Sequence, residues 1–544
     1  MTTKHEQAGM TTSCSNNIIP PPAALKEIDT DQLKKLLKPI RSTPDENRRS
    51  HFQNWSGEFK ANPLAIFQPV DEYQIQLILE LCRRESRRLR CYGSGHSPSD
   101  LACSDDYMIN LDRMSGLIEV DQNTKTIEVW AGTRLKDFNR LSLQHSLTLS
   151  VLGSISEQSI GGAVSTAIHG CGYGFGCFST YVDSLSLILA DSSQVTVNES
   201  EGHELFQASL CGLGLTGVIT KVKLRCERSF HLEETTYAIP FETFVNHYDA
   251  IARSAEHVRM YWYPQVDRVK VEKLNRTKKP QDQDTWRTRL QANIMWCFQW
   301  YIQPAILLLT KYLPDITDPY MAACYHSLNK PAVSIEESKE MPYDTLEALI
   351  QLETLKRSPK YRVNTSANIF NFDCGPPHHT FEGAIPYELT AEALKEFRSF
   401  LYSESRKPGG GLKMHFPMEI RPVAADHIWL SPACGQRVTY LGIVQFKAFG
   451  IEVNQEYKNL FQSFERILGT KYHLRPHWAK KHTQNFKSLD KSYGSNNNNF
   501  QRFLNVRQQV DPDFRFLNQY IFRHFMKNNH LLNGTQGDDQ NTSD

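Results

Sequence analysis

Two glycine-rich loops in the first third of the chain constrain its fold most strongly. The first loop carries Gly93 and Gly95, with His96 directly after them. Glycine lets the backbone turn with positive φ and aim successive N–H groups at one point, which forms a nest for an anionic diphosphate. A histidine beside such a nest is placed to touch, or to bond to, the group that carries the diphosphate. The loop therefore predicts a phosphate-bearing cofactor.

The second loop, residues 153–170, supplies a further run of small and hydroxylated side chains. Two such loops in one domain predict a large diphosphate cofactor that lies extended between them. The residues expected to contact it from these loops are Tyr92, Gly93, Ser94, Gly95, His96, Ser97, Ser156, Ser159, Gly161, Gly162, Ser165, Thr166, His169 and Gly170.

Composition places the chain in an ordinary class. At 544 residues it exceeds a single core and should divide into about two domains. With 61 basic and 60 acidic residues it has no global field to attract nucleic acid, so we expect no such partner. The 12 cysteines show no paired spacing and no Cys-x-x-Cys, which argues against a disulfide framework and a zinc ribbon. We expect no metal site, and we interpret His378-His379 as part of a loop.

The pattern along the chain indicates two folded units between polar tails. Residues 1–50 and 528–544 are polar and are expected to be disordered. Residues 51–228 alternate short strands and helices, and we interpret them as the cofactor domain. Residues 229–527 are longer, irregular and rich in aromatic side chains, so they should supply the substrate pocket, with the reactive site in the crevice between the domains.

A third glycine run, residues 212–217, matches the dinucleotide fingerprint formally. A Rossmann loop needs a strand before it and a helix after it. Here a helix is expected before the run, and the residues from Val218 to Leu224 alternate like a strand. We therefore interpret it as a helix-to-strand turn, with Val218 and Ile219 lying against the cofactor.

The segment from Ile294 to Leu309 contains no charged residue. It is somewhat short for a membrane span of about 20 residues, and Pro304 interrupts it. Trp296 and Trp300 are residue types that favour a headgroup interface. Two interpretations stay open at this stage: a buried core helix, or a patch that rests on a membrane without crossing it.

Together these residues resemble the sugar-1,4-lactone oxidases, flavoproteins of the vanillyl-alcohol-oxidase type. The likeness runs from about Phe52-Gln53-Asn54-Trp55 to Phe516-Leu517-Asn518. The segment Gly153-Ser154-Ile155-Ser156-Glu157-Gln158-Ser159 is most similar to the fungal members, the D-arabinono-1,4-lactone oxidases. The resemblance implies an α+β fold: a two-subdomain, PCMH-type FAD-binding domain, an α+β substrate (cap) domain, and a C-terminal segment that returns to the active site.

The resemblance also implies the cofactor and its attachment. His96 matches the histidine that carries covalent FAD through the 8α-methyl group in the oxidases of the family. A covalent link raises the reduction potential of a flavin and keeps it from leaving. Gly153 matches the glycine beside the flavin where the plant dehydrogenase of the family carries alanine, and a missing methyl would open a path for dioxygen. Ser154 matches an active-site serine of related alditol oxidases.

Two motifs of the second domain match the family's substrate residues. Glu419 and Arg421 occupy alternate positions, so on a strand both point to the same face. The resemblance assigns Arg421 to the lactone carbonyl and the reduced flavin, and Glu419 to a sugar hydroxyl. In Pro-His-Trp-x-Lys, His477 and Lys480 would share a face if the run is helical. His477 is assigned to the cofactor, and Lys480 to the substrate and flavin.

The implied activity is FAD-dependent oxidation of an aldono-1,4-lactone by dioxygen, which gives the 2-keto lactone on the route to erythroascorbate or ascorbate, and hydrogen peroxide. D-arabinono-1,4-lactone is the expected substrate, with L-gulono- and L-galactono-1,4-lactone as alternatives. The rivals are a dehydrogenase that reduces cytochrome c and an inactive membrane-bound flavoprotein scaffold. We expect a mitochondrial membrane location, with the endoplasmic reticulum as the alternative. The chain departs from the family at Phe446-Lys447-Ala448, where relatives usually carry Tyr-Arg-Pro.

Overall fold

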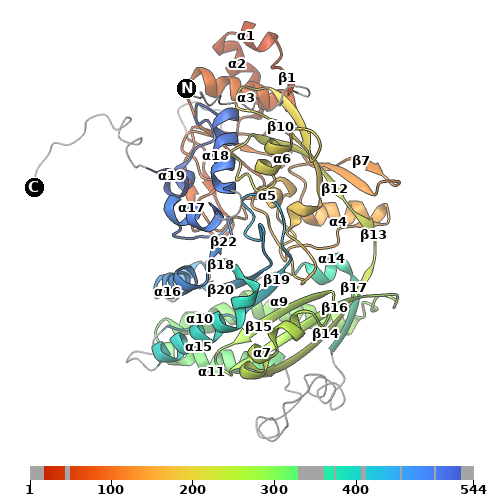
Figure 1. The fold of residues 1–544 in the computed structure, drawn as a ribbon, viewed down its shortest axis with the longest axis vertical. Helices are drawn as coiled ribbons and strands as arrows, with labels where there is room; N and C mark the ends of the chain where they lie inside the picture. The colour runs from red at the N-terminus through yellow and green to blue at the C-terminus, as the bar shows by residue number, and fades with distance from the viewer. Residues whose placement is uncertain are drawn as a thin grey trace, which may run out of the picture.

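The computed structural model describes residues 18–42, 49–328, 360–372, 375–405, 412–453, 456–494 and 498–527. It contains two bodies, one above the other in Figure 1, each built on its own sheets and hydrophobic core. The tail segments 1–17 and 528–544 lie outside the described residues. The architecture is the α+β arrangement that the sequence predicted.

The first glycine-rich loop follows a small parallel sheet. Helix α3 (Glu72–Arg84) begins at Asp71, whose carboxylate accepts a hydrogen bond from the Gln74 backbone N–H. It connects two of the sheet's strands, as parallel pairing requires. The strands run in the order β4-β6-β5, and their bounds are Ala65–Phe67 (β4), Leu89–Tyr92 (β5) and Tyr107–Asn110 (β6).

The second loop lies beside a larger antiparallel sheet in the order β1-β11-β10-β12-β8-β7. Helix α6 (His203–Ser209) ends before residues 212–217, and β12 begins directly after them. The third glycine run is therefore a helix-to-strand turn, as predicted. The strands are β1 (Ile18–Ile19), β7 (Leu117–Asp121), β8 (Thr126–Trp130), β10 (Val182–Ile188), β11 (Gln194–Asn198) and β12 (Val218–Arg225), with helices α4 (Leu135–Gln144) and α5 (Ile160–Ser165) alongside.

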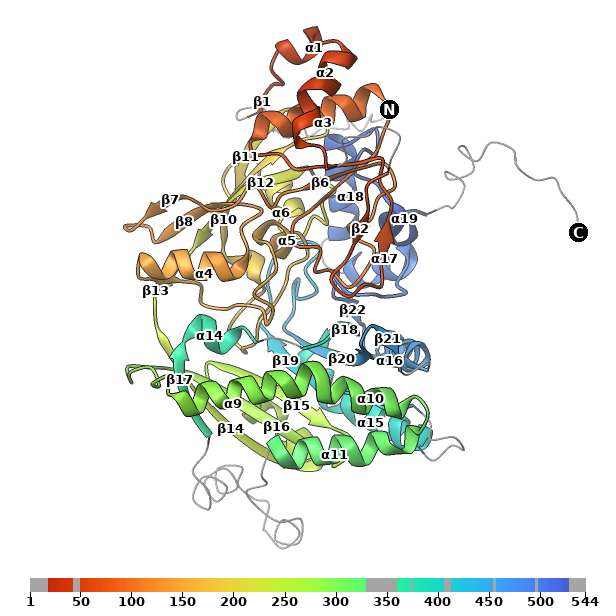
Figure 2. The same ribbon diagram turned by 180° about the vertical axis from the view of Figure 1, so that it is seen from behind.

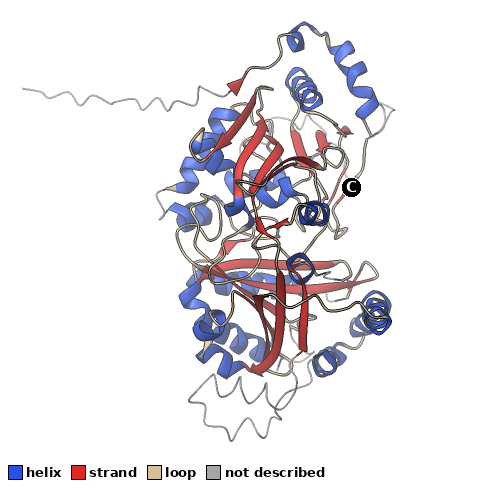
Figure 3. Cartoon of the chain, turned by 90° about the vertical axis from the view of Figure 1, so that its right-hand side faces the viewer, coloured by secondary structure: helices blue, strands red, loops and turns tan. Residues whose placement is uncertain are grey.

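The second body is an antiparallel sheet in the order β17-β14-β16-β15-β19-β20-β18-β22. Helices cover both of its faces, as Figure 3 shows from the side. On one face α7 (Phe241–Asn246), α15 (Thr390–Ser405) and α16 (Tyr457–Lys471) contribute to an aromatic-rich core. The strands are β14 (His231–Pro240), β15 (His257–Tyr263), β16 (Arg268–Thr277), β17 (Lys360–Thr365), β18 (His378–Pro386), β19 (Met418–Val423), β20 (Val438–Ala448) and β22 (Arg475–Pro476).

The C-terminal segment leaves the second sheet and returns to the first body. After β22 the chain forms α17 (Phe486–Gly494), α18 (Asn499–Val510) and α19 (Gln519–Phe525). Their apolar side chains belong to the same core cluster as the first body's strands. The turn between β22 and α17 therefore passes between the two bodies.

Part of the segment expected to be a disordered N-terminal tail is folded. Helix α2 (Thr30–Leu37) is capped by the Asp29 carboxylate and buries Leu33 and Leu37. It packs against α3 at the top of the molecule in Figure 2. A side-chain cap followed by apolar residues four apart is enough to form a short helix when a larger one covers its apolar face.

The uncharged segment forms most of one long helical stretch on the other face of the second sheet. It consists of α9 (Trp286–Cys297), a π-helical turn at Phe298–Ile302 and α10 (Gln303–Thr310). Helix α9 buries no residue, and Trp296 is 51% exposed. The π-helical turn is half-buried at Phe298, Gln299 and Trp300, and α10 turns one side to the protein, where Leu307 packs on β20. Among the described residues, no helix is both long and apolar enough to cross a membrane.

Candidate functional site

The two glycine-rich loops line a common cavity, whose empty space together with its solvent-filled mouth is about 1120 Å³. The turn after α6 and the turn after β22 close it. Residues predicted from the sequence that line it are Tyr92, Gly93, Ser94, Gly95, His96, Ser97, Ser159, Gly161, Gly162, Ser165, Thr166, Val218, Ile219, His477 and Lys480. Residues from four separate segments thus meet at one elongated space.

Two glycines of the first loop are required by its geometry. A Cβ on Gly93 would lie 2.1 Å from the Ser159 hydroxyl oxygen, so this close approach of the two loops excludes any side chain. Gly95 has φ of +66°, a left-handed conformation that favours glycine. These positions bring His96 to the cavity wall.

Trp55, to which the sequence assigned no role at the site, covers His96. The Trp55 ring stacks on the His96 imidazole, with centroids 5.7 Å apart and planes 19° apart. Its backbone N–H donates to the Gly95 carbonyl oxygen at 2.9 Å. The Trp55 ring also lines the cavity.

The cavity fits an extended diphosphate cofactor. The Gln158 amide oxygen is buried, lines the cavity and has no hydrogen-bond partner among the described residues. A buried acceptor of this kind is costly unless a ligand donates to it. With the glycine nest and the loop hydroxyls, it forms the donor and acceptor set that a nucleotide cofactor needs.

Three residues predicted to contact the cofactor lie outside the described lining of this cavity. Ser156 contributes a backbone carbonyl that accepts from Lys136 N–H. Gly170 is packed so closely that a Cβ there would lie 2.3 Å from Val151, so its role is in packing. His169 lies behind the cavity wall, where its ring stacks on Tyr440 at 3.5 Å between centroids.

Glu419 and Arg421 form a buried ion pair on β19, as their spacing predicted. Arg421 Nη2 lies 2.9 Å from Glu419 Oε2, and the two side chains are 7% and 16% exposed. Burial would lower the pKa of Arg421, but the charge of Glu419 outweighs it and raises that pKa. Arg421 Nε has no acceptor among the described residues, so one donor is left for a ligand.

A backbone contact links this pair to the second loop. The Arg421 guanidinium faces the Phe372 ring at 5.8 Å. Phe372 N–H donates to the Ser154 carbonyl oxygen at 2.9 Å, and the Asn371 side chain donates to the Gly153 carbonyl oxygen at 2.7 Å. Gly153 and Ser154 are therefore held in place by the second body, close to the predicted substrate pair.

The Pro-His-Trp-x-Lys motif is a turn rather than a helix. Lys480 N–H donates to the His477 carbonyl oxygen at 2.8 Å, which closes the turn and puts both side chains at the cavity. The run is therefore not the helix on which His477 and Lys480 would have shared a face, but both residues do line the same cavity. Burial lowers the pKa of His477 to about 3, so its ring is neutral.

A buried carboxylate that the sequence analysis missed, Glu382 on β18, lies behind this turn. One oxygen is 3.1 Å from His169 Nε2, and the other is 3.6 Å from Lys480 Nζ. Burial alone would raise the pKa of Glu382, but the charge and hydrogen bond of His169, together with Lys480, hold it well below its ordinary value. His169 Nδ1 faces the Gly170 carbonyl oxygen at 3.0 Å, so both ring nitrogens of His169 face oxygen atoms.

The same cluster is the one place among the described residues where three ligand-type side chains converge. Ligand atoms of His169, Glu382 and His477 lie within 4.8 Å of one another. The Lys480 ammonium already balances Glu382, and a second cation there would face its repulsion. We interpret the cluster as a charge-balancing group beside the cofactor cavity.

Lys447, at the position where the family resemblance implies arginine, does not belong to the described lining of the cavity. Its ammonium donates to the Ser56 carbonyl oxygen at 3.4 Å and lies 3.6 Å from Glu452. The neighbouring His378 and His379 begin strand β18, which corrects their assignment to a loop.

The geometry defines a flavoprotein of the FAD-binding type, and comparison with known proteins agrees. The FAD binding domain family model matches residues 63–198. The D-arabinono-1,4-lactone oxidase family model matches residues 222–524, more than half of the chain. The chain therefore belongs to the D-arabinono-1,4-lactone oxidase family.

Relatives and solved structures extend this result. The chain is 30% identical to the L-gulonolactone oxidase of Bos taurus over 477 residues, which cover 87% of this chain and 98% of the relative. It is 28% identical to a putative D-arabinono-1,4-lactone oxidase of Neurospora crassa, over 87% of this chain and 86% of the relative. Cholesterol oxidase from Brevibacterium sterolicum (His121Ala mutant) has the same fold, with a TM-score of 0.71 and 14% identity. The match covers 88% of this chain and 97% of the cholesterol oxidase chain.

Proposed function

We propose that this protein is an FAD-dependent aldonolactone oxidase that uses dioxygen as the electron acceptor. The observation that carries the proposal is the cavity lined by two glycine-rich loops and Lys480. The Glu419–Arg421 pair does not belong to the described lining, but it lies beside the second loop, where the Arg421 guanidinium faces Phe372. FAD, when bound, supplies the two-electron acceptor for the C–H beside the lactone carbonyl, and dioxygen then receives the electrons as hydrogen peroxide.

The residues of this chain would orient the lactone and stabilise charge. Arg421 is fixed by Glu419 and keeps its Nε donor for the lactone carbonyl oxygen. That oxygen gains electron density as the adjacent hydroxyl loses its proton, so a preorganised guanidinium interacts most strongly in the transition state. Glu419 accepts from a sugar hydroxyl, and Lys480 adds positive charge at the cavity wall.

Anaerobic titration with lactone tests this proposal. The yellow flavin spectrum should bleach when a five-carbon or six-carbon aldonolactone is added under nitrogen, and hydrogen peroxide should form once air is admitted. A protein that binds FAD but does not bleach with any lactone would instead be the inactive scaffold. Bleaching without peroxide, with reoxidation by cytochrome c, would identify the dehydrogenase.

D-arabinono-1,4-lactone is the substrate we propose, with L-gulono- and L-galactono-1,4-lactone as alternatives. The family model and the Neurospora relative favour the first, whereas the bovine relative carries the name of an L-gulonolactone oxidase. Ratios of kcat/KM across a panel of lactones, with peroxide as the readout, rank them. Because Lys447 does not line the cavity and donates to the Ser56 carbonyl oxygen, we expect Lys447→Arg to leave that ranking unchanged.

We also propose that the flavin is covalently bound through His96. The support is its place on the cavity wall, directly after the left-handed Gly95 and under the Trp55 ring. Acid precipitation of the protein should leave yellow colour in the pellet, and a His96→Ala protein should release it. A colourless wild-type pellet would contradict the attachment.

Finally, we propose that α9 and α10 rest on a membrane surface, with the mitochondrial membrane as the location and the endoplasmic reticulum as the alternative. Trp296, Ile302 and Leu309 are each more than half exposed on one helical stretch, and such a surface fits a headgroup interface.

Two variants test this docking surface. The double variant Ile302→Asp and Leu309→Asp should move active protein from the membrane pellet to the supernatant. Leu307→Asp is the matched control: that leucine is 1% exposed, so its charge should destabilise the fold by several kcal/mol. If the double variant still sediments with membranes, α9 and α10 are not the anchor.

A further inference from the structure

A short loop of the first body, residues 54–59, holds the peptide segment that carries His96. The Asn54 side chain donates to the Ser97 carbonyl oxygen at 3.0 Å. As described above, Trp55 N–H donates to the Gly95 carbonyl oxygen and its ring stacks on His96. The loop therefore grips the backbone on both sides of His96 and the imidazole itself.

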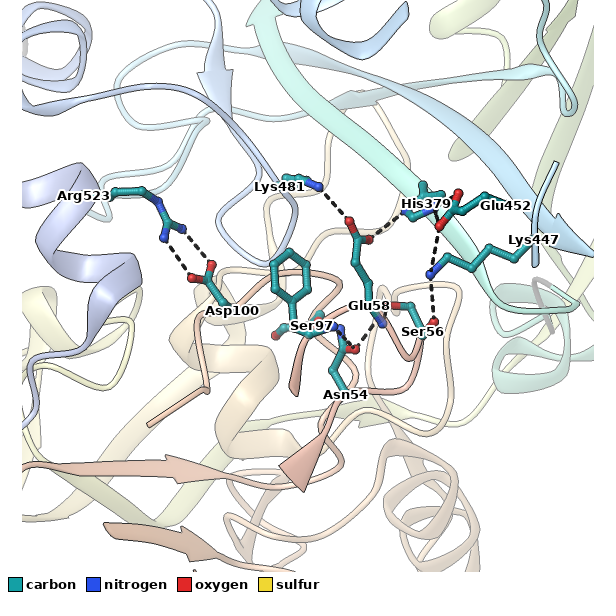
Figure 4. A network of polar contacts seen from close by, with 11 residues as sticks. Asn54, Ser56, Glu58, Ser97, Asp100, His379, Lys447, Glu452, Lys481 and Arg523 are labelled. Carbon is teal, nitrogen blue, oxygen red and sulfur yellow. Dashed lines mark hydrogen bonds and ion pairs between the residues drawn. The ribbon is translucent and has the colours of Figure 1, made fainter. Parts of the chain in front are cut away.

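Glu58 connects this loop to two other walls of the cavity (Figure 4). Its Oε2 accepts from His379 Nδ1 at 2.8 Å, and its Oε1 accepts from Lys481 Nζ at 2.6 Å. Each partner is the chain neighbour of a residue that lines the cavity, namely His378 and Lys480. A single carboxylate thus joins the His96 clamp, the start of β18 and the turn after β22.

The charges around Glu58 favour this arrangement. Burial alone would raise its pKa, but the hydrogen bond and charge of His379, followed by those of Lys481, lower it to about 2. His379 Nε2 also faces Glu452, at 2.7 Å, so both of its ring nitrogens face carboxylates. Burial would lower the pKa of His379, but the two carboxylates raise it, and the imidazolium is the form that satisfies both.

A second contact fixes the same loop. Lys447 donates to the Ser56 carbonyl oxygen and lies beside Glu452, as Figure 4 also shows. Two buried cations of the second body therefore hold the loop. His379 binds the Glu58 carboxylate, and Lys447 binds the Ser56 carbonyl oxygen. The partners are 321 and 391 positions away in the sequence and belong to the second body, so these two contacts form only after the two bodies have docked.

We propose that Glu58 is a positioning residue for flavin attachment. It holds loop 54–59 so that Trp55 fixes the His96 imidazole toward the cavity, and so that attachment waits for the docked second body. The inference rests on the proposed function in one respect, the covalent bond through His96. In that bond an imidazole nitrogen joins the flavin 8α-carbon. Nitrogen and carbon each lose one proton, and two electrons pass through the flavin to dioxygen, which leaves with both protons as hydrogen peroxide.

The test measures attachment separately from catalysis. Full-length Glu58→Gln protein is purified, its bound flavin is measured by absorbance, and the covalent fraction is measured after acid precipitation, before and during incubation with excess FAD. We expect bound flavin at a level close to wild type but a covalent fraction that grows about tenfold more slowly, which corresponds to 1.4 kcal/mol in the barrier. Glu58→Asp, which keeps the charge, should recover part of the rate.

Glu465→Gln is the matched control. Its carboxylate is also buried and also accepts hydrogen bonds, from Thr483 N–H and Gln484, but it does not line or bracket the cavity. Its covalent fraction should match wild type even if its stability falls. If Glu58→Gln does not fold, Lys481→Met removes one anchor from a side chain that is 44% exposed, and it should slow attachment to a smaller degree.

The outcomes separate the two proposals. A yellow wild-type pellet with equally fast attachment in Glu58→Gln, or in Lys481→Met, overturns the role of Glu58 alone. A colourless wild-type pellet overturns covalent attachment through His96 and the role of Glu58 with it. Slow attachment in the Glu58 variants but not in Glu465→Gln supports the inference.

Discussion

The substitution Arg421→Lys tests the core of the proposed chemistry. Lysine keeps the positive charge but loses the planar fork, so its donors cannot meet Glu419 and the lactone in the same fixed geometry. Removing one preorganised donor from a buried, developing negative charge costs about 2.7–4 kcal/mol, or roughly 10²- to 10³-fold in rate. We expect flavin reduction to slow by about 10²-fold or more, with a smaller change in lactone binding.

Rapid-mixing measurements under nitrogen give both quantities from one series of lactone concentrations. Arg259→Lys is a matched control, because Arg259 is buried on the neighbouring strand β15 and also pairs with a carboxylate, Glu272. Its Nε donates to that carboxylate, whereas Arg421 Nε has no acceptor among the described residues. This control should lower stability and leave flavin reduction near the wild-type rate. If Arg421→Lys reduces its flavin as fast as wild type, the pair is structural and the active site is elsewhere.

Two further predictions concern Gly153 and Glu382. Gly153→Ala should slow reoxidation by dioxygen about tenfold or more, a barrier of about 1.4 kcal/mol, and spare anaerobic reduction. The tightest contact of the new Cβ would be the flexible end of Ile168 at 3.3 Å, and its contacts with Gln158 Oε1 and the His169 carbonyl oxygen would be ordinary ones at 3.6 Å. Stopped-flow traces in which both half-reactions fall together would count against this gate. Glu382→Gln should cost about 3 kcal/mol at pH 7, since removing one partner leaves buried cations unpaired. The folded pKa of Glu382 is lowered, so its contribution is complete above the ordinary carboxyl pKa and is lost as pH falls through the folded value. Calorimetry should therefore show that the Tm difference between Glu382→Gln and wild type becomes smaller below about pH 4. A difference that grows there would refute a lowered pKa for Glu382.

The parts of the site that follow from local rules could be predicted from the sequence. Glu419 and Arg421 share a face because a strand has period two, and the structure confirms that strand. The left-handed turn at Gly95 follows from backbone sterics, whereas Gly93 is required by the approach of Ser159 from the second loop. The same period would have found Glu382, since His378, Thr380 and Glu382 alternate along β18 and the first two line the cavity. Assigning His378 and His379 to a loop hid that pattern.

Other contacts carry no local signal. Asn371 holds the Gly153 carbonyl oxygen from 218 positions away, and Glu58 meets His379 across 321 positions. Side-chain hydrogen bonds of this kind depend on how the two bodies dock, which no short-range pattern reports. Helix α2 is a different case: the Asp29 cap and the spacing of Leu33 and Leu37 were visible, but the polar, proline-rich surroundings favoured a tail.

The turn after β22 shows why the family motif works without a helix. Lys480 and Lys481 are adjacent, yet Lys480 lies beside Glu382 and Lys481 beside Glu58. Strand β18 takes part in both contacts, because Glu382 belongs to one of its faces and His379, the partner of Glu58, to the other. The turn is therefore held by two ion pairs, Lys480 with Glu382 and Lys481 with Glu58. A shift of Lys480 along the cavity would strain the adjacent contact between Lys481 and Glu58. The proposed substrate end and the proposed attachment end of the flavin site would therefore be coupled through two neighbouring lysines.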